Sequence, residues 1–282
     1  MGVCIKLATR SLRKNKGRTL ITLMGIVLSV LMVCTIFTLL NSMLDSAIDS
    51  IIEKDGNWHI AVYNTTAEQI ADLEAAEGVL STQMISIDEN DVFRITLKNP
   101  DEVYEFASRY LSETTEYSYH TELLSYLGVS QNENIKSLII GIAAALLLII
   151  AVGAVSLIYN AFAISVSERT KEIGLLSSIG ATKKDIRTIV YAEALLLGTL
   201  AIPLGMVLGV FSSWALLDVF GAYMGKILYV NMDMRLHING WLLVLTTIFG
   251  YLLVFLSAGV PARSASKISI ISNLKGEKGV MK

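Results

Sequence analysis

Four long runs of the chain contain no charged residue. Asp, Glu, Lys and Arg are absent from residues 19–44, 137–167, 194–217 and 236–262. Each run exceeds the roughly 20 apolar residues that a helix needs to cross the hydrocarbon layer of a bilayer. The pattern therefore predicts an α-helical membrane protein with four transmembrane helices, at residues 18–44, 137–167, 193–217 and 236–262.

Residues 45–136 form the only long polar segment, and their pattern predicts a small α+β domain between the first and second transmembrane helices. A Thr-x-x-Glu pattern at residues 65–68 predicts a capping box and a helix that runs to about Ala76 and ends at Gly78. Asn99 followed by Pro100 predicts the start of a second helix. The remaining predicted elements are strands at 58–63, 79–85 and 92–97 and a helix at 121–127 closed by Gly128.

Composition excludes most soluble classes of protein. Hydrophobic residues make up 53% and charged residues 17% of the chain, with a mean hydropathy of +0.58, whereas a soluble domain is roughly 25% charged. The first apolar run is too long for a cleavable signal peptide. Cys4 and Cys34 are the only cysteines, one before the first span and one inside it, so we expect no disulfide between them.

The distribution of charge predicts the orientation. Residues 1–18, 168–193 and 263–282 hold 16 of the 23 Lys and Arg residues, while residues 45–136 hold eighteen acidic residues and five basic ones. By the positive-inside rule, both termini and the loop at 168–192 are cytoplasmic. The domain at 45–136 and the short loop at 218–235 are then extracellular, and the tail at 263–282 is cytoplasmic.

Residues 1–17 predict a cytoplasmic amphipathic helix that lies on membrane lipids. Lys6, Arg10, Arg13 and Lys14 share one helical face, as an anionic lipid surface favours. The alternative is a plain basic flank that only sets topology.

No catalytic or metal-binding motif occurs in the chain. GxxxxGK[ST], HExxH, CxxC and GxSxG are absent, and His59, His120 and His237 are scattered. We therefore expect no catalytic residue, metal ligand or cofactor in this chain, and no nucleic-acid partner. Any energy source must come from another protein.

The loop at 168–192 combines charged and apolar positions on one predicted helix. Opposite charges stand three residues apart, Glu168 with Lys171 and Arg169 with Glu172. Ile173, Leu176 and Ile179 then form an apolar edge, and Gly180 breaks the helix.

The third predicted span carries two further features. Gly205 and Gly209 form a GxxxG pattern, which permits close helix packing. Glu193 stands at the cytoplasmic entrance of the span, where an acid near hydrocarbon is costly. Two readings of Glu193 remain open: a functional acid, or a side chain that reaches the membrane interface.

Several motifs resemble those of FtsX-like, MacB-type ABC transporter permeases. They are SERTKEIGLL at 167–176, IGATKKDI at 179–186, EALLLG at 193–198 and PARSASKIS at 261–269, with Ile270 where proline is often found. The resemblance implies a four-span permease subunit that works by mechanotransmission. A separate ABC ATPase dimer would bind ATP and Mg²⁺, and a second permease subunit, identical or related, would complete the pair. The segment carrying Glu168, Arg169, Glu172, Ile173, Leu176, Ile179 and Gly180 would dock on the ATPase as a coupling helix.

The resemblance also implies a function. It is the export or expulsion of a peptide or lipid-like substrate, as in antimicrobial peptide export or resistance, at the plasma membrane of a bacterium. The alternative is an FtsX-like regulator that activates a cell-wall hydrolase outside the cell, and a shortened half-permease is a third reading. Residues 45–136 are fewer than in MacB-type exporters and resemble the first half of ten-span permeases, which favours a single-membrane cell.

Two consequences are open to test. Leu176→Asp would place a charge in the contact with the ATPase, and we expect it to abolish coupling. We also expect the first and third spans to lie near the interface of the permease pair.

Overall fold

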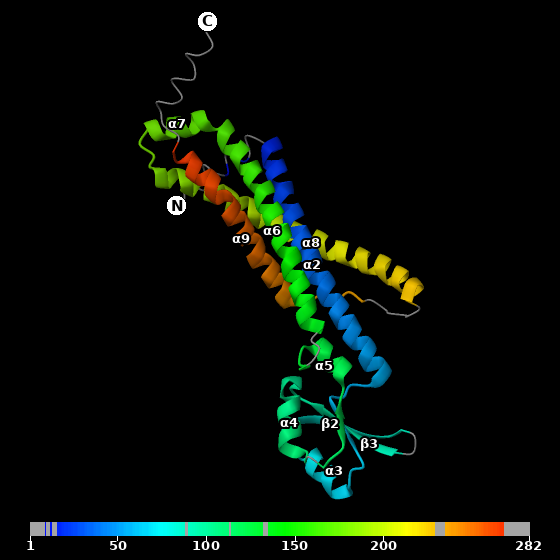
Figure 1. Ribbon diagram of the computed structural model, residues 1–282. Helices are drawn as coiled ribbons and strands as arrows, with labels where there is room; N and C mark the ends of the chain where they lie inside the picture. The colour runs from blue at the N-terminus through cyan, green and yellow to red at the C-terminus, as the bar shows by residue number, and fades with distance from the viewer. Residues whose placement is uncertain are drawn as a thin grey trace. The chain divides into compact units, whose positions relative to one another are not determined.

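The computed structural model describes residues 9, 12, 16–87, 90–112, 114–131, 135–228 and 235–267. It divides into two units (Figure 1). The helical unit comprises residues 1–39, 143–218 and 236–282, and the α+β unit comprises residues 40–142 and 219–235. Most of the predicted amphipathic helix at 1–17, and the tail from residue 268 onward, lie outside the described residues.

Four helices in the described part of the chain are long and apolar enough to cross a membrane. They are α2 (Lys16–Asp55), α6 (Ile135–Glu168), α8 (Lys183–Leu228) and α9 (Gly240–Ala265), and Figure 1 shows them side by side. The prediction of a helical protein with four such spans is confirmed.

The long helices extend past the predicted membrane boundaries. α2 continues from residue 44 to Asp55, because no glycine or proline interrupts it before Gly56 and because Ala47 and Ile51 are buried. Gly56 then adopts a left-handed backbone with φ of 89°. α8 takes in part of the predicted cytoplasmic loop and part of the predicted loop at 218–235. The charged residues therefore define the ends of the apolar runs, but the helices continue beyond them.

The helical unit has an apolar core to which all four long helices contribute. Its buried members are Ile26 and Val30 from α2, Ile158 and Phe162 from α6, Ala194, Leu197, Ala201 and Ile202 from α8, and Val254 and Ala258 from α9.

Two glycines bring α8 against α2. A Cβ atom at Gly205 would lie 2.8 Å from Cβ of Val30, and one at Gly209 would lie 2.6 Å from Cβ of Cys34. Both distances are too short for real Cβ atoms, so only glycine permits this approach. Thr35 Oγ1 donates to the Gly209 carbonyl at 3.2 Å across the same contact. The predicted packing role of the GxxxG pair is seen here inside one chain.

The α+β unit contains a four-stranded antiparallel sheet in the order β2-β3-β1-β4. The strands are β1 (Ile60–Tyr63), β2 (Val79–Ile87), β3 (Asn90–Leu97) and β4 (Tyr117–Tyr119). The helices are α3 (Ala67–Glu74), the short 3₁₀ helix η1 (Pro100–Glu102), α4 (Val103–Tyr110) and α5 (Thr121–Leu127). The β-α-β-β-α-β order and strand arrangement are those of a ferredoxin-like fold.

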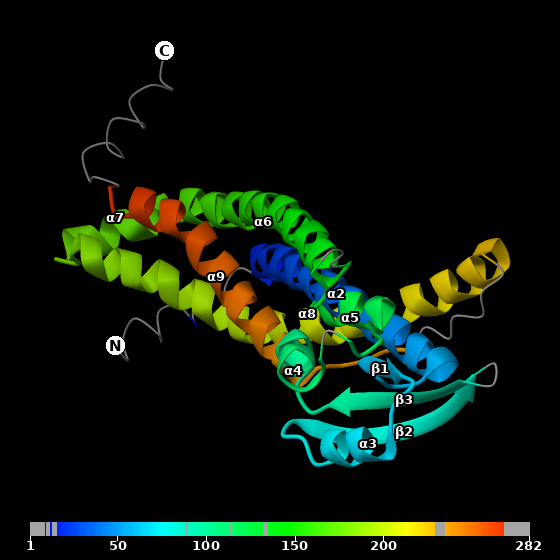
Figure 2. The same ribbon diagram turned by 60° about the horizontal axis from the view of Figure 1, so that its bottom comes forward.

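Figure 2 shows α3 and α4 beside the strands β2 and β3. One buried cluster joins the helices of this unit to its sheet. It contains Ile60, Val62, Phe93, Ile95 and Leu97 from the sheet, Leu73 from α3, Val103, Phe106 and Ala107 from α4, and Leu124 from α5. The three predicted strands and three predicted helices are therefore present.

Two details of this unit differ from the sequence prediction. The capping box of α3 is one residue later than expected: Thr66 caps the helix and pairs with Gln69, not Thr65 with Glu68. β4 was not predicted, because three residues are too few to show alternation.

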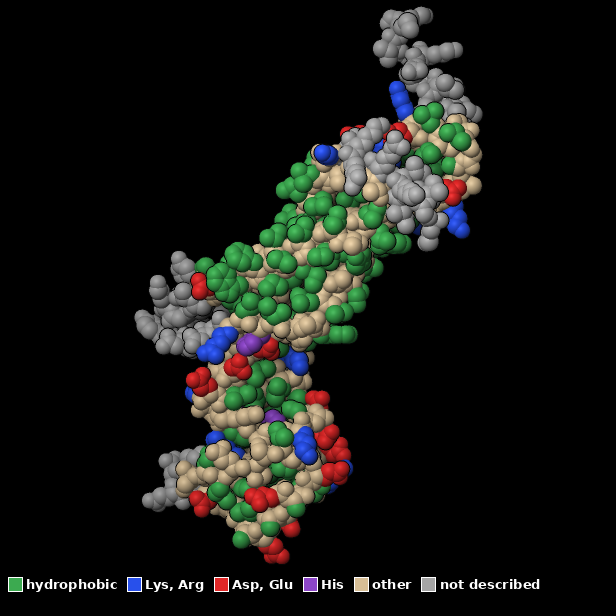
Figure 3. Space-filling model, turned by 180° about the vertical axis from the view of Figure 1, so that it is seen from behind, with side chains coloured by type: hydrophobic (Ala, Val, Ile, Leu, Met, Phe, Trp, Pro, Cys, Tyr) green, Lys and Arg blue, Asp and Glu red, His purple; other side chains and the backbone are tan. Residues whose placement is uncertain are grey.

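The surfaces of the two units differ in composition. Hydrophobic side chains cover much of the helical unit, whereas charged side chains gather on the α+β unit (Figure 3). An apolar outer surface is what a lipid environment requires of a helical bundle.

Candidate functional site

The candidate site is built around α7 (Thr170–Ser178), a short helix between α6 and α8. α6 ends at Glu168, and Arg169 leaves the helical conformation before α7 begins. Gly180 adopts φ of 100° and its N–H donates to the Ser177 carbonyl at 3.2 Å, so the predicted helix break at this glycine is confirmed. α6, α7 and α8 are therefore three helices separated by two sharp turns.

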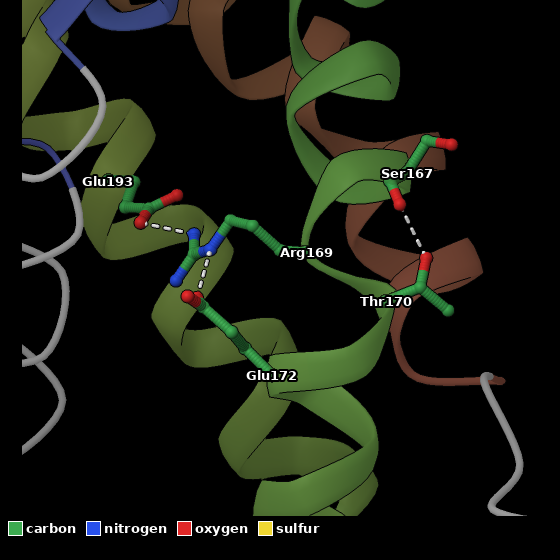
Figure 4. A network of polar contacts seen from close by, with 5 residues as sticks. All are labelled: Ser167, Arg169, Thr170, Glu172 and Glu193. Atoms are coloured by element: carbon green, nitrogen blue, oxygen red, sulfur yellow. Dashed lines mark hydrogen bonds and ion pairs between the residues drawn. The ribbon is translucent and has the colours of Figure 1, made fainter. Parts of the chain in front are cut away.

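A buried ion pair holds α7 to α8. Arg169 Nη1 donates to Glu193 Oε1 at 2.5 Å, and Arg169 Nε lies 3.4 Å from Glu172 Oε2. Figure 4 shows Glu193 from α8 and Glu172 from α7 pointing toward the same guanidinium group. The side chain of Glu193 is only 4% exposed and that of Arg169 11%, whereas Glu172 is 45% exposed.

The carboxylate of Glu193 is buried as the partner of Arg169. The predicted Arg169–Glu172 pair is confirmed. The Arg169–Glu193 pair was missed, because the two residues are 24 positions apart and only the turn after α6 brings them together.

The inner face of α7 is part of the protein's own core. Ile173 is 5% exposed and packs in a cluster with Val166, Ile186, Val190, Ala262 and Ala265. Leu176 is half-buried and lines a cavity of about 20 Å³ beside Ile173 and Ile189. The expectation that Ile173 belongs to an outward apolar edge is therefore wrong, because the turn at Arg169 directs this side of the helix onto α8 and α9.

The outer face of α7 carries a different apolar pair. Leu175 is 65% exposed and Ile179 is 83% exposed. Three exposed basic residues accompany them: Lys171, Lys183 and Lys184. Leu175 was missed because it lies outside the three-residue spacing that selected Ile173, Leu176 and Ile179. Gly180, also exposed, ends this surface.

The turn into α8 is fixed by a second set of polar contacts. Thr182 Oγ1 donates to Asp185 Oδ2 at 2.6 Å and accepts from the Asp185 N–H at 3.2 Å. Hydrogen bonds from the Thr182 hydroxyl and N–H lower the pKa of the Asp185 carboxyl. Arg187 Nε donates to Ser266 Oγ at 3.0 Å, which joins the start of α8 to the end of α9.

The α+β unit holds a separate cluster of ionisable groups. The centroid of the His120 imidazole lies 4.4 Å from that of the Trp58 ring, with the two planes tilted by 45°. The guanidinium carbon of Arg94 lies 4.8 Å from the centroid of the same Trp58 ring. Arg94 Nη1 and Trp58 Nε1 both donate to the Asp55 carbonyl, at 2.8 and 3.0 Å. This cluster fastens the last residue of α2 to the sheet.

Both histidines of this unit accept a hydrogen bond from a backbone N–H. Nδ1 of His59 accepts from the Leu97 N–H at 3.0 Å, and Nδ1 of His120 accepts from the Leu123 N–H at 3.3 Å. Burial lowers the pKa of His59, and the nearby His120 lowers it further. Burial also lowers the pKa of His120, with Arg94 acting in the same direction and Asp55 and Glu122 opposing it.

Residues 143–270, which include α7 and the Arg169–Glu193 pair, match the family described as FtsX-like permease C-terminal. This part of the chain is an FtsX-like permease domain. The resemblance to FtsX/MacB-type permeases, inferred from the motifs around α7, is thereby confirmed.

The chain is similar to several named proteins. An uncharacterized ABC transporter permease of Methanocaldococcus jannaschii is 31% identical over 193 residues, which are 65% of this chain and 45% of that protein. A second permease of the same archaeon is 47% identical over 62 residues, 22% of this chain and 16% of that protein. The macrolide export ATP-binding/permease protein MacB of Campylobacter jejuni is 28% identical over 120 residues, 43% of this chain and 17% of that protein. The chain thus spans less than half the length of each of these relatives.

Proposed function

We propose that the chain is the transmembrane subunit that couples ATP hydrolysis by a separate ABC ATPase dimer to the export or expulsion of a peptide or lipid-like substrate. Its relatives support this, because they are named ABC transporter permeases and an ATP-binding/permease protein. The printed sequence contains no P-loop motif, so ATP and Mg²⁺ would bind the partner.

The observation that carries the proposal is the two-sided character of α7. Its inner side is anchored by the Arg169–Glu193 pair and by buried Ile173. Its outer side presents Leu175 and Ile179 to whatever lies beyond it. An apolar pair bordered by lysines is suited to enter a groove whose rim is acidic. A helix fixed on one side and free to bind on the other transmits a displacement instead of absorbing it.

The orientation and location belong to the same proposal. Both termini and α7 face the cytoplasm, where ATP is available, and the acidic α+β unit lies outside the cell at a bacterial plasma membrane. The relatives above come from an archaeon and a bacterium. The alternative function, regulation of a cell-wall hydrolase, would use the same α7 contact. The two functions differ in what stimulates the ATPase, which is a peptide or lipid for a transporter and a hydrolase for a regulator.

The test replaces one exposed residue of α7. Ile179→Asp puts a carboxylate into the proposed contact, and an unpaired charge in a buried interface costs several kcal/mol. Because Ile179 is 83% exposed, the substitution leaves the permease's own core intact. This position replaces Leu176→Asp as the informative variant, since Leu176 lines an internal cavity. Ser178→Asp is the matched control: the neighbouring residue is exposed and also lies at the end of α7.

The chain is co-expressed with each ABC ATPase of its own genome that lacks a permease domain, and any complex is purified through a tag on the chain. Ile179→Asp is expected to reduce the bound ATPase at least tenfold, while Ser178→Asp retains it. Equal amounts of ATPase on both variants would show that α7 is not the docking helix.

A further inference from the structure

β2 forms one edge of the sheet in the α+β unit (Figure 2). Its backbone pairs with β3 on one side, and no strand of the described chain pairs with it on the other. After an irregularity between Val79 and Ser81, the pairing with β3 is regular as far as Ile87. The backbone of such an edge presents unpaired N–H and C=O groups at every second residue.

The two edges of the sheet differ in how they are protected. β4, at the opposite edge, is only three residues long, and a short edge strand offers few unpaired groups. β2 contains no charged residue, proline or glycine, which are the residues that commonly protect a long edge. Leu80 is 61% exposed and Met84 45% exposed. The described chain therefore leaves β2 open to an added strand.

Two carboxylates flank this edge on one face of the sheet. Thr82 Oγ1 donates to Glu74 Oε1 of α3 at 3.3 Å, and Ser86 Oγ donates to Asp91 Oδ1 at 3.1 Å. Side chains alternate along a strand, so Thr82, Met84 and Ser86 share one face. The two carboxylates therefore contact β2 at points about 13 Å apart, at about 3.3 Å per residue, and the apolar Met84 lies midway between these points.

This pattern of charge disfavours a second copy of β2 as the occupant of the edge. In an antiparallel pair of two β2 strands centred on Met84, Thr82 of one copy would stand opposite Ser86 of the other. Glu74 of one copy would then approach Asp91 of the other at both ends of the pair. Like charges that face each other across two strands are destabilising, whereas basic side chains at the same two places would be stabilised.

We infer that the β2 edge binds an extended peptide by strand addition, and that this peptide carries two basic residues four positions apart with an apolar residue midway between them. The peptide backbone would pair with the open edge, its basic side chains with Glu74 and Asp91, and its apolar side chain with Met84. A lipid-like molecule lacks the row of alternating donors and acceptors that such an edge requires. The inference rests on the proposed function and narrows it, because it selects a peptide over a lipid-like substrate.

The first test measures peptide binding to the full chain in detergent micelles, without an ATPase. The probe is a fluorescent seven-residue peptide with lysine at its second and sixth positions, leucine at its fourth and threonine elsewhere. Two derivatives each carry two backbone N-methyl groups, at the third and fifth positions or at the fourth and sixth. Successive N–H groups of a strand point to opposite edges, so only one derivative loses its pairing with β2. Fluorescence anisotropy is expected to show an affinity lower by about tenfold or more for that derivative alone.

The second test changes the edge. Glu74→Gln removes a charge but keeps an acceptor for Thr82, and it is expected to weaken binding about threefold, as for an exposed ion pair. Glu68→Gln is the matched control, because Glu68 is an exposed acid of the same helix; it is expected to leave the affinity unchanged. Met84→Lys places a like charge between the two lysines of the probe, and it is expected to weaken binding by about tenfold or more.

Hydrogen exchange locates the bound peptide. Amides of residues 81–87 are expected to gain protection when the probe binds, while those of β4 remain unchanged. Equal affinity for the two methylated derivatives, or equal affinity of Glu74→Gln and Glu68→Gln, would overturn strand addition at this edge. Protection of β2 without the probe, together with a doubled mass, would show that the occupant is a second copy. Since no ATPase is present, failure here leaves the docking of α7 untouched, and failure of the Ile179→Asp test leaves peptide binding untouched.

Discussion

The buried ion pair beneath α7 predicts an asymmetric response to mutation. Arg169 has two carboxylate partners, Glu193 and Glu172. Among the residues that the structure describes, Glu193 forms an ion pair with Arg169 alone, and its side chain is 4% exposed. Arg169→Met therefore leaves a carboxylate buried with its charge uncompensated, whereas Glu193→Gln leaves Arg169 paired with Glu172.

The structure sets the size of each effect. Removing one partner of a buried pair typically costs about 3–5 kcal/mol of folding free energy, and we assign that range to Arg169→Met. Glu193→Gln keeps an acceptor for the guanidinium group, and we expect a loss of about 1.5–3 kcal/mol, the value of one hydrogen bond to a charged group. The double variant Arg169→Met/Glu193→Leu removes both charges, and it is expected to recover most of the lost stability.

The assay is unfolding of the purified permease in detergent, followed by tryptophan fluorescence against denaturant. The control is Arg109→Met in α4, where the Arg109–Glu105 pair has side chains 58% and 68% exposed. A pair of that kind contributes about 0.3–0.5 kcal/mol. The reasoning is refuted if Arg169→Met destabilises no more than Arg109→Met, or if the double variant is no more stable than Arg169→Met alone.

Three further predictions follow from packing, titration and charge. Gly209→Ala forces α8 away from α2, because its Cβ atom would meet Cβ of Cys34 at 2.6 Å; it is expected to reduce the yield of folded permease severalfold, whereas Gly141→Ala, with nothing within 4 Å, is expected to leave it unchanged. Burial holds the folded-state pKa of both histidines in the α+β unit below the unfolded value of about 6.5. The folded state therefore binds fewer protons than the unfolded state, and stability is lost as pH falls below about 6.5. Hydrogen exchange of the unit between pH 7.5 and 5 measures this loss, and His120→Gln is expected to weaken the dependence of stability on pH. In a cysteine-free background, Ser81→Cys is expected to react with an impermeant maleimide in intact cells and Ser178→Cys to remain unlabelled, and the reverse pattern overturns the orientation.

Features with a local cause were predictable from the sequence. The four apolar runs gave the four long helices, since a bilayer-length apolar helix has no soluble alternative. Gly128 and Gly180 ended their helices as expected, because both adopt the left-handed backbone that glycine favours. The strands of the α+β unit followed from alternation at Phe93 and Ile95, both of which are buried.

Features set by tertiary geometry were not predictable. The side of α7 that faces inward depends on the turn at Arg169, and no periodicity within α7 encodes that turn. Ile173 and Leu175 are both apolar, yet one is 5% exposed and the other 65%. Glu193 could be recognised as an unusual residue from its place beside an apolar run, but its partner lies on another helix. The helix that packs against the GxxxG pair could not be predicted for the same reason, because the pattern indicates close packing but does not identify the partner helix.

The contacts of the helical unit explain why a displacement of α7 would reach α2. α7 cannot slide on α8 without separating Arg169 from Glu193, which would leave a buried carboxylate unpaired. α8 cannot easily shift on α2, because Gly209 sits against Cys34 at a distance that tolerates no added atom. Both junctions are therefore stiff, as the proposed coupling through α7 would require. α2 then continues as one helix to Asp55, whose carbonyl is held by Arg94 and Trp58 of the α+β unit. The residues that meet at each junction are distant in sequence, and each junction resists relative movement of the two helices that it joins.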